Sequence, residues 1–203
     1  MTPKPMKQLV AAALLLFAVP LARAEIYRVD LIVFLDKSAP GEQGRGYDLP
    51  DLSHSINLDN AADLKAAGIS VLPEEKFALN NEWQHLKLAK SYQPLMRLAW
   101  TQENPPAERG PALHLRWGST LIINDPGSMT TGLVSPVDGS VALLLGRYLH
   151  LDADLIYSQK TETGVASYRL REKRRMKRDE LHHLDSPRLG IVAKVSKVPA
   201  GGG

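Results

Sequence analysis

Alternation between apolar and polar side chains is clearest between residues 143 and 157. One set of alternate positions contains Leu143, Leu145, Arg147, Leu149, Leu151, Ala153, Leu155 and Tyr157, and the other contains Tyr148, His150, Asp152 and Asp154. A period of two is that of a β-strand, in which successive side chains point to opposite faces of a sheet. We therefore expect a strand with one face on the core and the other in water.

A second alternating segment follows a turn expected in residues 160–166. Its residues Tyr168, Leu170 and Met176 would share one face. The opposite face would carry a row of cations formed by Arg169, Arg171, Lys173, Arg175 and Lys177. Two alternating segments joined by a short turn predict a long antiparallel hairpin.

Three other segments have the character of strands. Residues 27–35 alternate at first and then become wholly apolar, which is typical of a central strand. Residues 113–117 alternate, and residues 191–195 form a mostly apolar run near the end of the chain. Each of the three segments is expected to form one strand of a sheet.

The best helix candidate runs from Glu82 to Gln102. One side of this helix would be apolar, with Leu86, Ala89, Leu95, Leu98 and Ala99. Pro94 should kink or split it, because proline lacks the N–H that an internal helical residue donates. One or two helical turns are also expected in residues 60–67, which Gly68 would end, and in residues 179–185.

The order of these elements predicts the fold class. Strand, helix, strand, long hairpin, short helical turn and strand together indicate an α+β domain, with helices on one face of a mostly antiparallel sheet. A ferredoxin-like variant has a comparable order. Segments rich in glycine and proline, residues 37–52 and 124–139, predict surface loops.

The first residues have the pattern of a cleaved signal peptide. Lys4 and Lys7 precede an apolar run from Leu9 to Val19, and the small-x-small triplet 22–24 follows. The run is shorter than the roughly 20 residues that a spanning helix needs, and no comparable run occurs later. We expect residues 1–24 to be removed, residues 25–198 to form one domain without a membrane span, and residues 199–203 to form a flexible tail.

Charge and cysteine content narrow the function classes. The chain has 25 Lys and Arg residues against 22 Asp and Glu residues. Removal of the signal peptide takes away three of the cations, Lys4, Lys7 and Arg23, so the expected mature chain has 25 − 3 = 22 cations and 22 anions. This balance argues against nucleic-acid binding driven by overall positive charge. The chain has no cysteine, which excludes disulfides and a lipid-modified cysteine.

The residue patterns do not predict an enzyme, a metal site or a cofactor. His182 and His183 lie among acidic residues, but their spacing matches neither His-Glu-x-x-His nor its inverted form. His150 and Asp152 could form a two-ligand clip, although a solvated strand face explains them equally well. The sequence has no Gly-x-Ser-x-Gly or Ser-x-x-Lys motif and no thiol nucleophile.

The cationic face of the expected hairpin is the strongest charge feature. One interpretation pairs it with Asp152 and Asp154 across the hairpin, as opposite charges on facing strands stabilise each other. The other is that it binds a carboxylate ligand, because the planar fork of arginine can hold a carboxylate through two bonds. Both can hold, since two aspartates cannot neutralise the whole row. The candidate ligand-binding residues are Arg147, Tyr148, His150, Arg169, Arg171 and Arg175.

Aromatic residues offer a further candidate chemistry. Trp100, Trp117 and Tyr148 could provide flat faces on which sugars rest. Large aromatic side chains are more often part of a core, and Trp100 is the strongest candidate for such a structural role.

Four segments resemble one known family. They are residues 27–34 (YRVDLIVF), 92–100 (YQPLMRLAW), 146–152 (GRYLHLD) and 174–185 (RRMKRDELHHLD), followed by Pro187 and Gly190. Together they resemble the CsiV family, which comprises periplasmic peptidoglycan-binding proteins of Gram-negative bacteria. The similarity covers most of the expected mature chain and is weakest in residues 38–59.

The resemblance implies a non-enzymatic protein of the periplasm that binds peptidoglycan and assists its assembly. It further implies support for a penicillin-binding synthase and its outer-membrane activator. The alternative is an exported scaffold or chaperone-like protein, which would bind other envelope proteins through a sheet edge and would not bind glycan. The resemblance assigns no ligand residues, so the candidate residues come from the sheet pattern alone.

Overall fold

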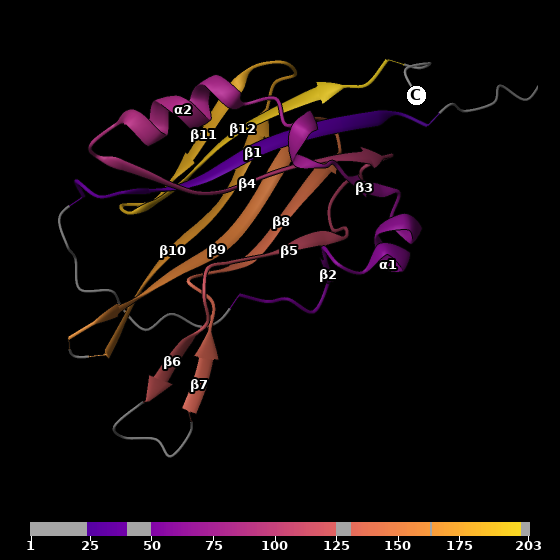
Figure 1. Ribbon diagram of the computed structural model, residues 1–203. Coiled ribbons are helices and arrows are strands. Elements are labelled where there is room, and N and C mark those ends of the chain that lie inside the picture. Colours follow the sequence, from indigo (N-terminus) through magenta and orange to yellow (C-terminus); the bar gives the residue numbers. More distant parts are fainter. Residues whose placement is uncertain (1–23, 40–49, 125–130, 163, 200–203) are drawn as a thin grey trace, which may run out of the picture.

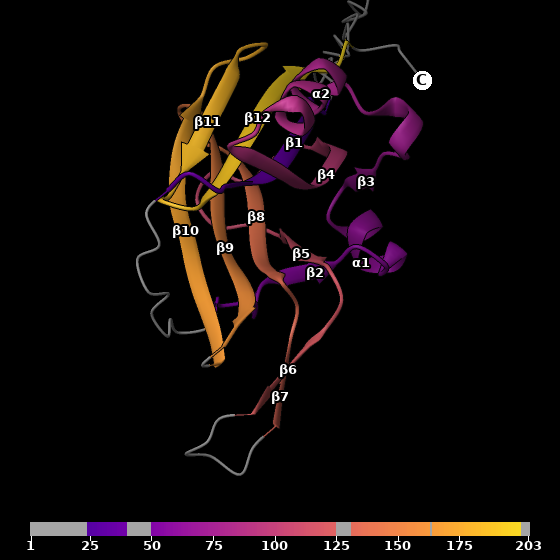
Figure 2. The same cartoon turned by 60° about the vertical axis from the view of Figure 1, so that its left-hand side comes forward.

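Two five-stranded sheets packed against each other form the body of the protein (Figure 1). The computed structural model describes residues 24–39, 50–124, 131–162 and 164–199. Sheet A has the order β11-β12-β1-β4-β3, and sheet B has the order β10-β9-β8-β5-β2. Among the described residues, strands β6 and β7 pair with each other alone, and they project from one end of the molecule (Figure 2).

Sheet A is antiparallel throughout. Its strands are β1 (Ile26–Asp36), β3 (Ile69–Val71), β4 (Tyr92–Glu103), β11 (Leu181–Asp185) and β12 (Leu189–Lys197). The described residues also contain two α-helices and a 3-10 helix, which are α1 (Ala61–Ala66), η1 (Glu74–Lys76) and α2 (Asn80–Leu88).

Sheet B is antiparallel except for the parallel pair β2 and β5. Its strands are β2 (Ser55–Asn57), β5 (Ala112–Trp117), β8 (Val137–Leu145), β9 (Leu149–Thr161) and β10 (Gly164–Met176). The separate hairpin consists of β6 (Leu121–Asn124) and β7 (Thr131–Val134). Strand β10 also contacts β11 and β12, so the two sheets come together along that side.

The core lies between the two sheets and is contributed by alternate residues of their facing strands. Val29, Leu31 and Val33 of β1 are buried from sheet A, and Leu151 and Leu155 of β9 are buried from sheet B. All five belong to one apolar cluster that draws on both sheets. Burial of large aliphatic side chains contributes roughly 1.5–3 kcal/mol each, which makes this layer the main source of stability.

The expectation of an α+β fold with helices on one sheet face, or of a ferredoxin-like variant, is wrong. The main cause lies in residues 82–102, where only α2 is helical and β4 is a long strand beside β1. Met96, Leu98 and Trp100 face the core at a period of two. The pattern was obscured because Leu95 and Ala99 are also apolar, and they fill in the spacing of a helix.

Pro94 marks the place where β4 departs from regular pairing. Val33 pairs with Met96 and the next residue, Phe34, pairs with Pro94, so Leu95 is the extra residue of a bulge. A bulge tolerates proline because the ladder is interrupted there and one N–H is not required. Pro94 therefore lies at a bulge in a strand and does not kink a helix.

Other predicted elements have mixed outcomes. The strands at residues 27–35, 113–117 and 191–195, the helix between Asn60 and Gly68, and the long hairpin are confirmed. Residues 181–185 form β11 where helical turns were expected, because Leu184 faces the core and the segment pairs with β12. The loop expected at 124–139 is wrong in part, since it contains β7 and the start of β8.

The strand expected at 143–157 is two strands. A turn at residues 146–148 separates β8 from β9, which then pair with each other. Arg147 consequently lies in the turn and not on the core face. The expected signal peptide lies outside the described residues up to position 23, as do residues 40–49 of the expected first loop and residues 200–203 of the expected tail.

Candidate functional site

The outer face of sheet B carries the predicted cationic row. Arg169, Arg171, Lys173 and Arg175 alternate along β10, as the sequence predicts, while Leu170 and Met176 are buried on the inner side. The register places Arg171 opposite Asp154 and Lys173 opposite Asp152. The neighbouring strand β8 contributes Ser140, Ala142 and Leu144 to the same face.

Arg169 is held in an ion pair with Asp154. Its Nε donates to Asp154 Oδ1 at 2.7 Å, and its Nη2 donates to Oδ2 at 2.6 Å. Both side chains are less than a fifth exposed. The interpretation that the cationic row pairs across the hairpin is therefore confirmed at Asp154, and this arginine has a role in the sheet itself.

The next cations along β10 remain available to a ligand. Arg171 Nε is 3.8 Å from Asp154 Oδ2, but 74% of the Arg171 side chain is exposed. Lys173 is exposed and makes no ion pair with Asp152, although the two residues face each other. Asp154 already accepts two bonds from Arg169, so Arg171 keeps most of its hydrogen-bonding capacity.

Four of the predicted residues meet where β9 begins and β10 ends. We call this group the arginine–tyrosine corner, consisting of Arg147, Tyr148, His150 and Arg175. The guanidinium carbon of Arg175 lies 3.4 Å from the Tyr148 ring centroid, and that of Arg147 lies 5.6 Å from it. His150 pairs with Arg175 in the register, and its Nδ1 is 3.0 Å from the Tyr148 carbonyl oxygen.

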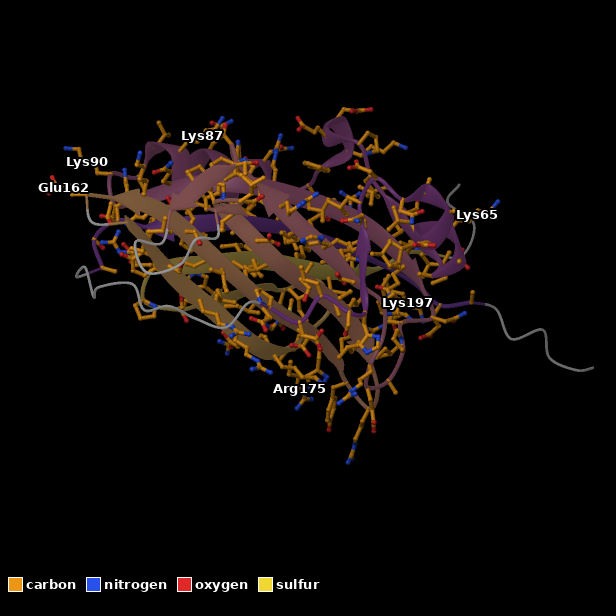
Figure 3. The ribbon with its side chains drawn as sticks, turned by 90° about the horizontal axis from the view of Figure 1, so that it is seen from below. Lys65, Lys87, Lys90, Glu162, Arg175 and Lys197 are labelled. Carbon is orange, nitrogen blue, oxygen red and sulfur yellow. The ribbon has the colours of Figure 1, made fainter. Side chains whose placement is uncertain are left out.

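The stacking in the corner determines what it can bind. Arg175 covers one face of the Tyr148 ring, so that face is not open to a sugar. A guanidinium stacked on an aromatic ring still presents its N–H groups at the edge, where they can bind a carboxylate. Figure 3 shows Arg175 at the margin of the molecule, on the side away from Lys87 and Lys90. The corner thus favours an anionic ligand over a stacked sugar.

The tryptophans do not contribute an aromatic platform to this face. Trp100 is completely buried in the core, as expected. Trp117 is exposed at the end of β5, where its register partner is Val137, whereas Arg175 and Tyr148 lie near the opposite end of β9.

A cleft of about 720 Å³ lies on the same face of sheet B. Its apolar lining includes Ala112 of β5 together with Ala142 and Leu144 of β8. Its charged and titratable lining residues are Asp51, His54, Glu108, Arg109, Asp152, Asp154 and Arg171. The first four lie in segments that precede β2 and β5, so loops and strands together form the site.

Asp152 is the least satisfied charge in this cleft. It is half-buried, and within the described ranges its carboxylate makes no hydrogen bond and no ion pair. Asp51 differs, because hydrogen bonds from the Ser53 hydroxyl and backbone N–H lower the pKa of the Asp51 carboxyl, with smaller contributions from His54 and Arg109. The cleft therefore combines stabilised and unpartnered anions with two arginines.

The sequence identified only one side of this site. Arg171, Asp152 and Asp154 follow from strand alternation, but Asp51 and Arg109 lie in irregular segments with no periodic pattern. Polar residues beside proline and glycine in residues 106–111 indicate a loop, and nothing in that pattern indicates which face of the sheet the loop would approach.

His114, His182 and His183 are each engaged in contacts within the fold. His114 lies opposite Ser140, but its Nδ1 is 3.0 Å from Asn57 Oδ1 and its Nε2 is 2.7 Å from Asp138 Oδ1. Both ring nitrogens are engaged, so this histidine is not placed to take a proton from Ser140. His183 stacks on Phe34, and His182 Nε2 accepts a hydrogen bond from the Lys177 N–H. Among the described residues, no group of three or more His, Asp or Glu side chains is arranged to hold a metal ion.

A comparison with protein families decides the affiliation. The model of a family described as peptidoglycan-binding protein, CsiV, matches residues 7–198. The chain belongs to the CsiV family. The resemblance seen in the sequence is thereby confirmed, and the matched range includes every strand from β1 to β12, with the cleft and the arginine–tyrosine corner. Searches of curated proteins and of solved structures gave no significant match.

The CsiV description names a binding protein and no reaction. In the part of the chain that the structure describes, neither helix has the length and apolar character needed to cross a membrane.

Proposed function

We propose that this protein binds peptidoglycan in the periplasm without catalysing a reaction, and that the outer face of sheet B is its binding surface. Family membership supports the class of ligand. The observation that supports this surface is the position of Arg171 and Arg175 on one strand face, the first largely exposed and the second stacked on Tyr148 with its edge available.

The chemistry of the wall fits this surface. Stem peptides of peptidoglycan carry carboxylates, and an arginine can hold a carboxylate through two parallel N–H bonds. A single exposed ion pair contributes only about 0–1 kcal/mol. Two arginines on one strand face compensate for this weakness, because once Arg171 or Arg175 has engaged a carboxylate, the other is held close to further carboxylates of the wall.

Sedimentation with purified sacculi tests the proposal. Residues 25–203 should pellet with sacculi at low salt, and the pelleted fraction should fall as salt rises, because exposed charges are screened over about 8–10 Å at 0.10–0.15 M ionic strength. Protein that remains in the supernatant even at low salt contradicts wall binding. It would favour the exported scaffold, which binds other envelope proteins.

The second part of the proposal concerns peptidoglycan assembly. We propose that the protein supports a penicillin-binding synthase together with its outer-membrane activator, as the family resemblance implies. A reconstituted synthase with its activator should polymerise lipid-linked precursor faster when this protein is added. An unchanged rate, measured with protein that does bind sacculi, would restrict the function to wall binding.

A further inference from the structure

We propose that the cleft on sheet B binds the end of a stem peptide that carries both a free ammonium group and a carboxylate, so that the protein recognises stems that are not cross-linked. This inference rests on the proposed function and specifies which part of the wall the site contacts. It follows from the mixture of charges in the cleft.

Asp152 is the group in the cleft that would bind a cation. It projects from β9 beside Ala142 of β8, is half-buried, and makes no bond within the described part of the chain. A carboxylate withdrawn from water without a partner costs free energy that a bound ammonium group would recover. Lys173 faces Asp152 from β10 but remains exposed and forms no ion pair with it.

Arg171 and Arg109 are the groups in the cleft that would bind an anion. Arg171 lines the cleft from β10, which is separated from β8 by β9. Arg109 lines the cleft from the segment before β5. Arg171 has only a distant contact with Asp154, which Arg169 already holds. A ligand carboxylate could therefore take up the free donors of the Arg171 fork.

The size and lining of the cleft fit a short peptide. Its volume of about 720 Å³ lies within the roughly 300–1,000 Å³ of sites that bind small ligands. Ala112, Ala142 and Leu144 offer an apolar base against which methylene and methyl groups can lie. A sugar would require aromatic faces or dense hydroxyl partners, and no Trp, Tyr or Phe is among the lining residues that the structure describes.

Cross-linking removes the charge of the stem-peptide amine that Asp152 would bind. In an uncross-linked stem, the side chain of the diamino acid ends in an ammonium group beside a carboxylate. When that amine is acylated in a cross-link, it becomes a neutral amide and loses its charge. A site that pairs a half-buried carboxylate with the amine should reject the cross-linked form, because the carboxylate would stay unpartnered.

Calorimetric titration with a defined tripeptide tests the inference. The probe is L-alanyl-γ-D-glutamyl-meso-diaminopimelate with its alanine amine capped as a lactyl amide, as it is in the wall. It is compared with the same capped peptide acetylated on its side-chain amine (the acetylated form) and with a third form amidated on the side-chain carboxylate (the amidated form). We expect the free tripeptide to bind residues 25–203 and each blocked form to bind about tenfold or more weakly, as is usual for loss of one charged hydrogen bond. Equal binding of the free and acetylated forms overturns the inference.

Two variants test which residue binds which end of the ligand. Asp152→Asn should bind the free and acetylated tripeptides equally, and Arg171→Gln should bind the free and amidated tripeptides equally. Arg171 is largely exposed, so its variant keeps the test valid if Asp152→Asn does not fold. Glu162→Gln, at the far turn of the β9–β10 hairpin (Figure 3), is the matched control and should retain full discrimination.

Failure of the stem-peptide inference can be distinguished from failure of the proposed wall binding. Protein that pellets with sacculi but binds no tripeptide contradicts the stem inference and leaves wall binding intact. Protein that binds the tripeptide but does not pellet with sacculi supports the cleft and contradicts binding to the assembled wall. Glycan strands from which an amidase has removed the stems are soluble, so they are tested as competitors. If they displace the protein from sacculi as well as soluble wall fragments that keep their stems, the inference is overturned.

Discussion

Arg169 holds Asp154 through two hydrogen bonds, although the residue directly opposite Asp154 is Arg171. The diagonal pair leaves Arg171 exposed at the rim of the cleft. One aspartate thus divides the cationic row into an arginine that stabilises the sheet and an arginine that is available to a ligand. Stability and binding can therefore be tested with different substitutions on the same strand.

The division predicts unequal effects on folding. Arg169→Ala should lower the free energy of unfolding by about 1–3 kcal/mol, because Asp154 would lose its bidentate partner while mostly buried. Arg171→Ala should change it by less than about 0.5 kcal/mol, as for most exposed positions. Urea denaturation measures both, and an equal loss in the two variants would contradict the assignment.

A second ion pair, between half-buried Arg28 and buried Asp30, attaches the segment before α2 to sheet A. Asp30 accepts bonds from Arg28 at 2.7 and 2.8 Å and from the Ala78 N–H at 2.9 Å, and Arg28 also donates to the Lys76 carbonyl. Asp30→Asn should lower the free energy of unfolding by roughly 2–4 kcal/mol. Asp59→Asn, at an exposed position, is the control. Hydrogen exchange should quicken first at Ala78, and unchanged exchange there would refute the attachment.

Gly139 permits the close approach of β8 and β9. Its φ of +150° is unfavourable for other residues, and a Cβ there would lie 2.1 Å from the Asp154 carbonyl oxygen. Gly139→Ala should therefore cost more than the roughly 1–3 kcal/mol of backbone strain alone. Gly164→Ala has a similar φ of +143° but no atom within 4 Å of its Cβ, so it should show the strain alone. Thermal unfolding that ranks Gly164→Ala as the more damaging change would contradict this packing.

Acid should weaken the contact between the start of β1 and the end of β12. Hydrogen bonds from Lys197 and then from Tyr27 lower the pKa of Glu25 from 4.5. A carboxyl whose pKa is lowered by folding stabilises the protein above pH 4.5, and that contribution is lost as the pH falls through the folded-state pKa. Glu25→Gln should therefore make the unfolding free energy less dependent on pH below 4.5. Identical acid profiles for this variant and the wild type would exclude a stabilising contact.

Elements with a clear alternation of apolar and polar residues could be predicted from the sequence, and elements without one could not. The β9–β10 hairpin was predictable because one face is apolar and the other charged over its whole length. Strand β4 was mistaken for helix because Leu95 sits in a bulge and Ala99 adds a second buried face. Strand β11 was missed because its five residues include His182, His183 and Asp185, and only tertiary pairing with β12 makes them extended.

The site was predictable only as far as it lies on strands. Alternation placed Arg171, Arg175 and His150 on one face, and the structure groups Arg175 and His150 with Tyr148. Alternation could not separate Arg169 from Arg171, since their difference arises from a diagonal contact with Asp154. It also could not bring in Arg109, which reaches the cleft from a loop.

The most direct test of wall binding is sedimentation of a double charge reversal. Arg171→Glu with Arg175→Glu should abolish pelleting with sacculi at low salt, while the folded state persists because both residues lie on the exposed face of β10. Lys65→Glu with Lys90→Glu makes the same change of charge on exposed residues far from Arg175 (Figure 3) and should pellet like the wild type. If the variant with both arginines reversed is folded and still pellets with sacculi, then the outer face of sheet B is not the binding surface.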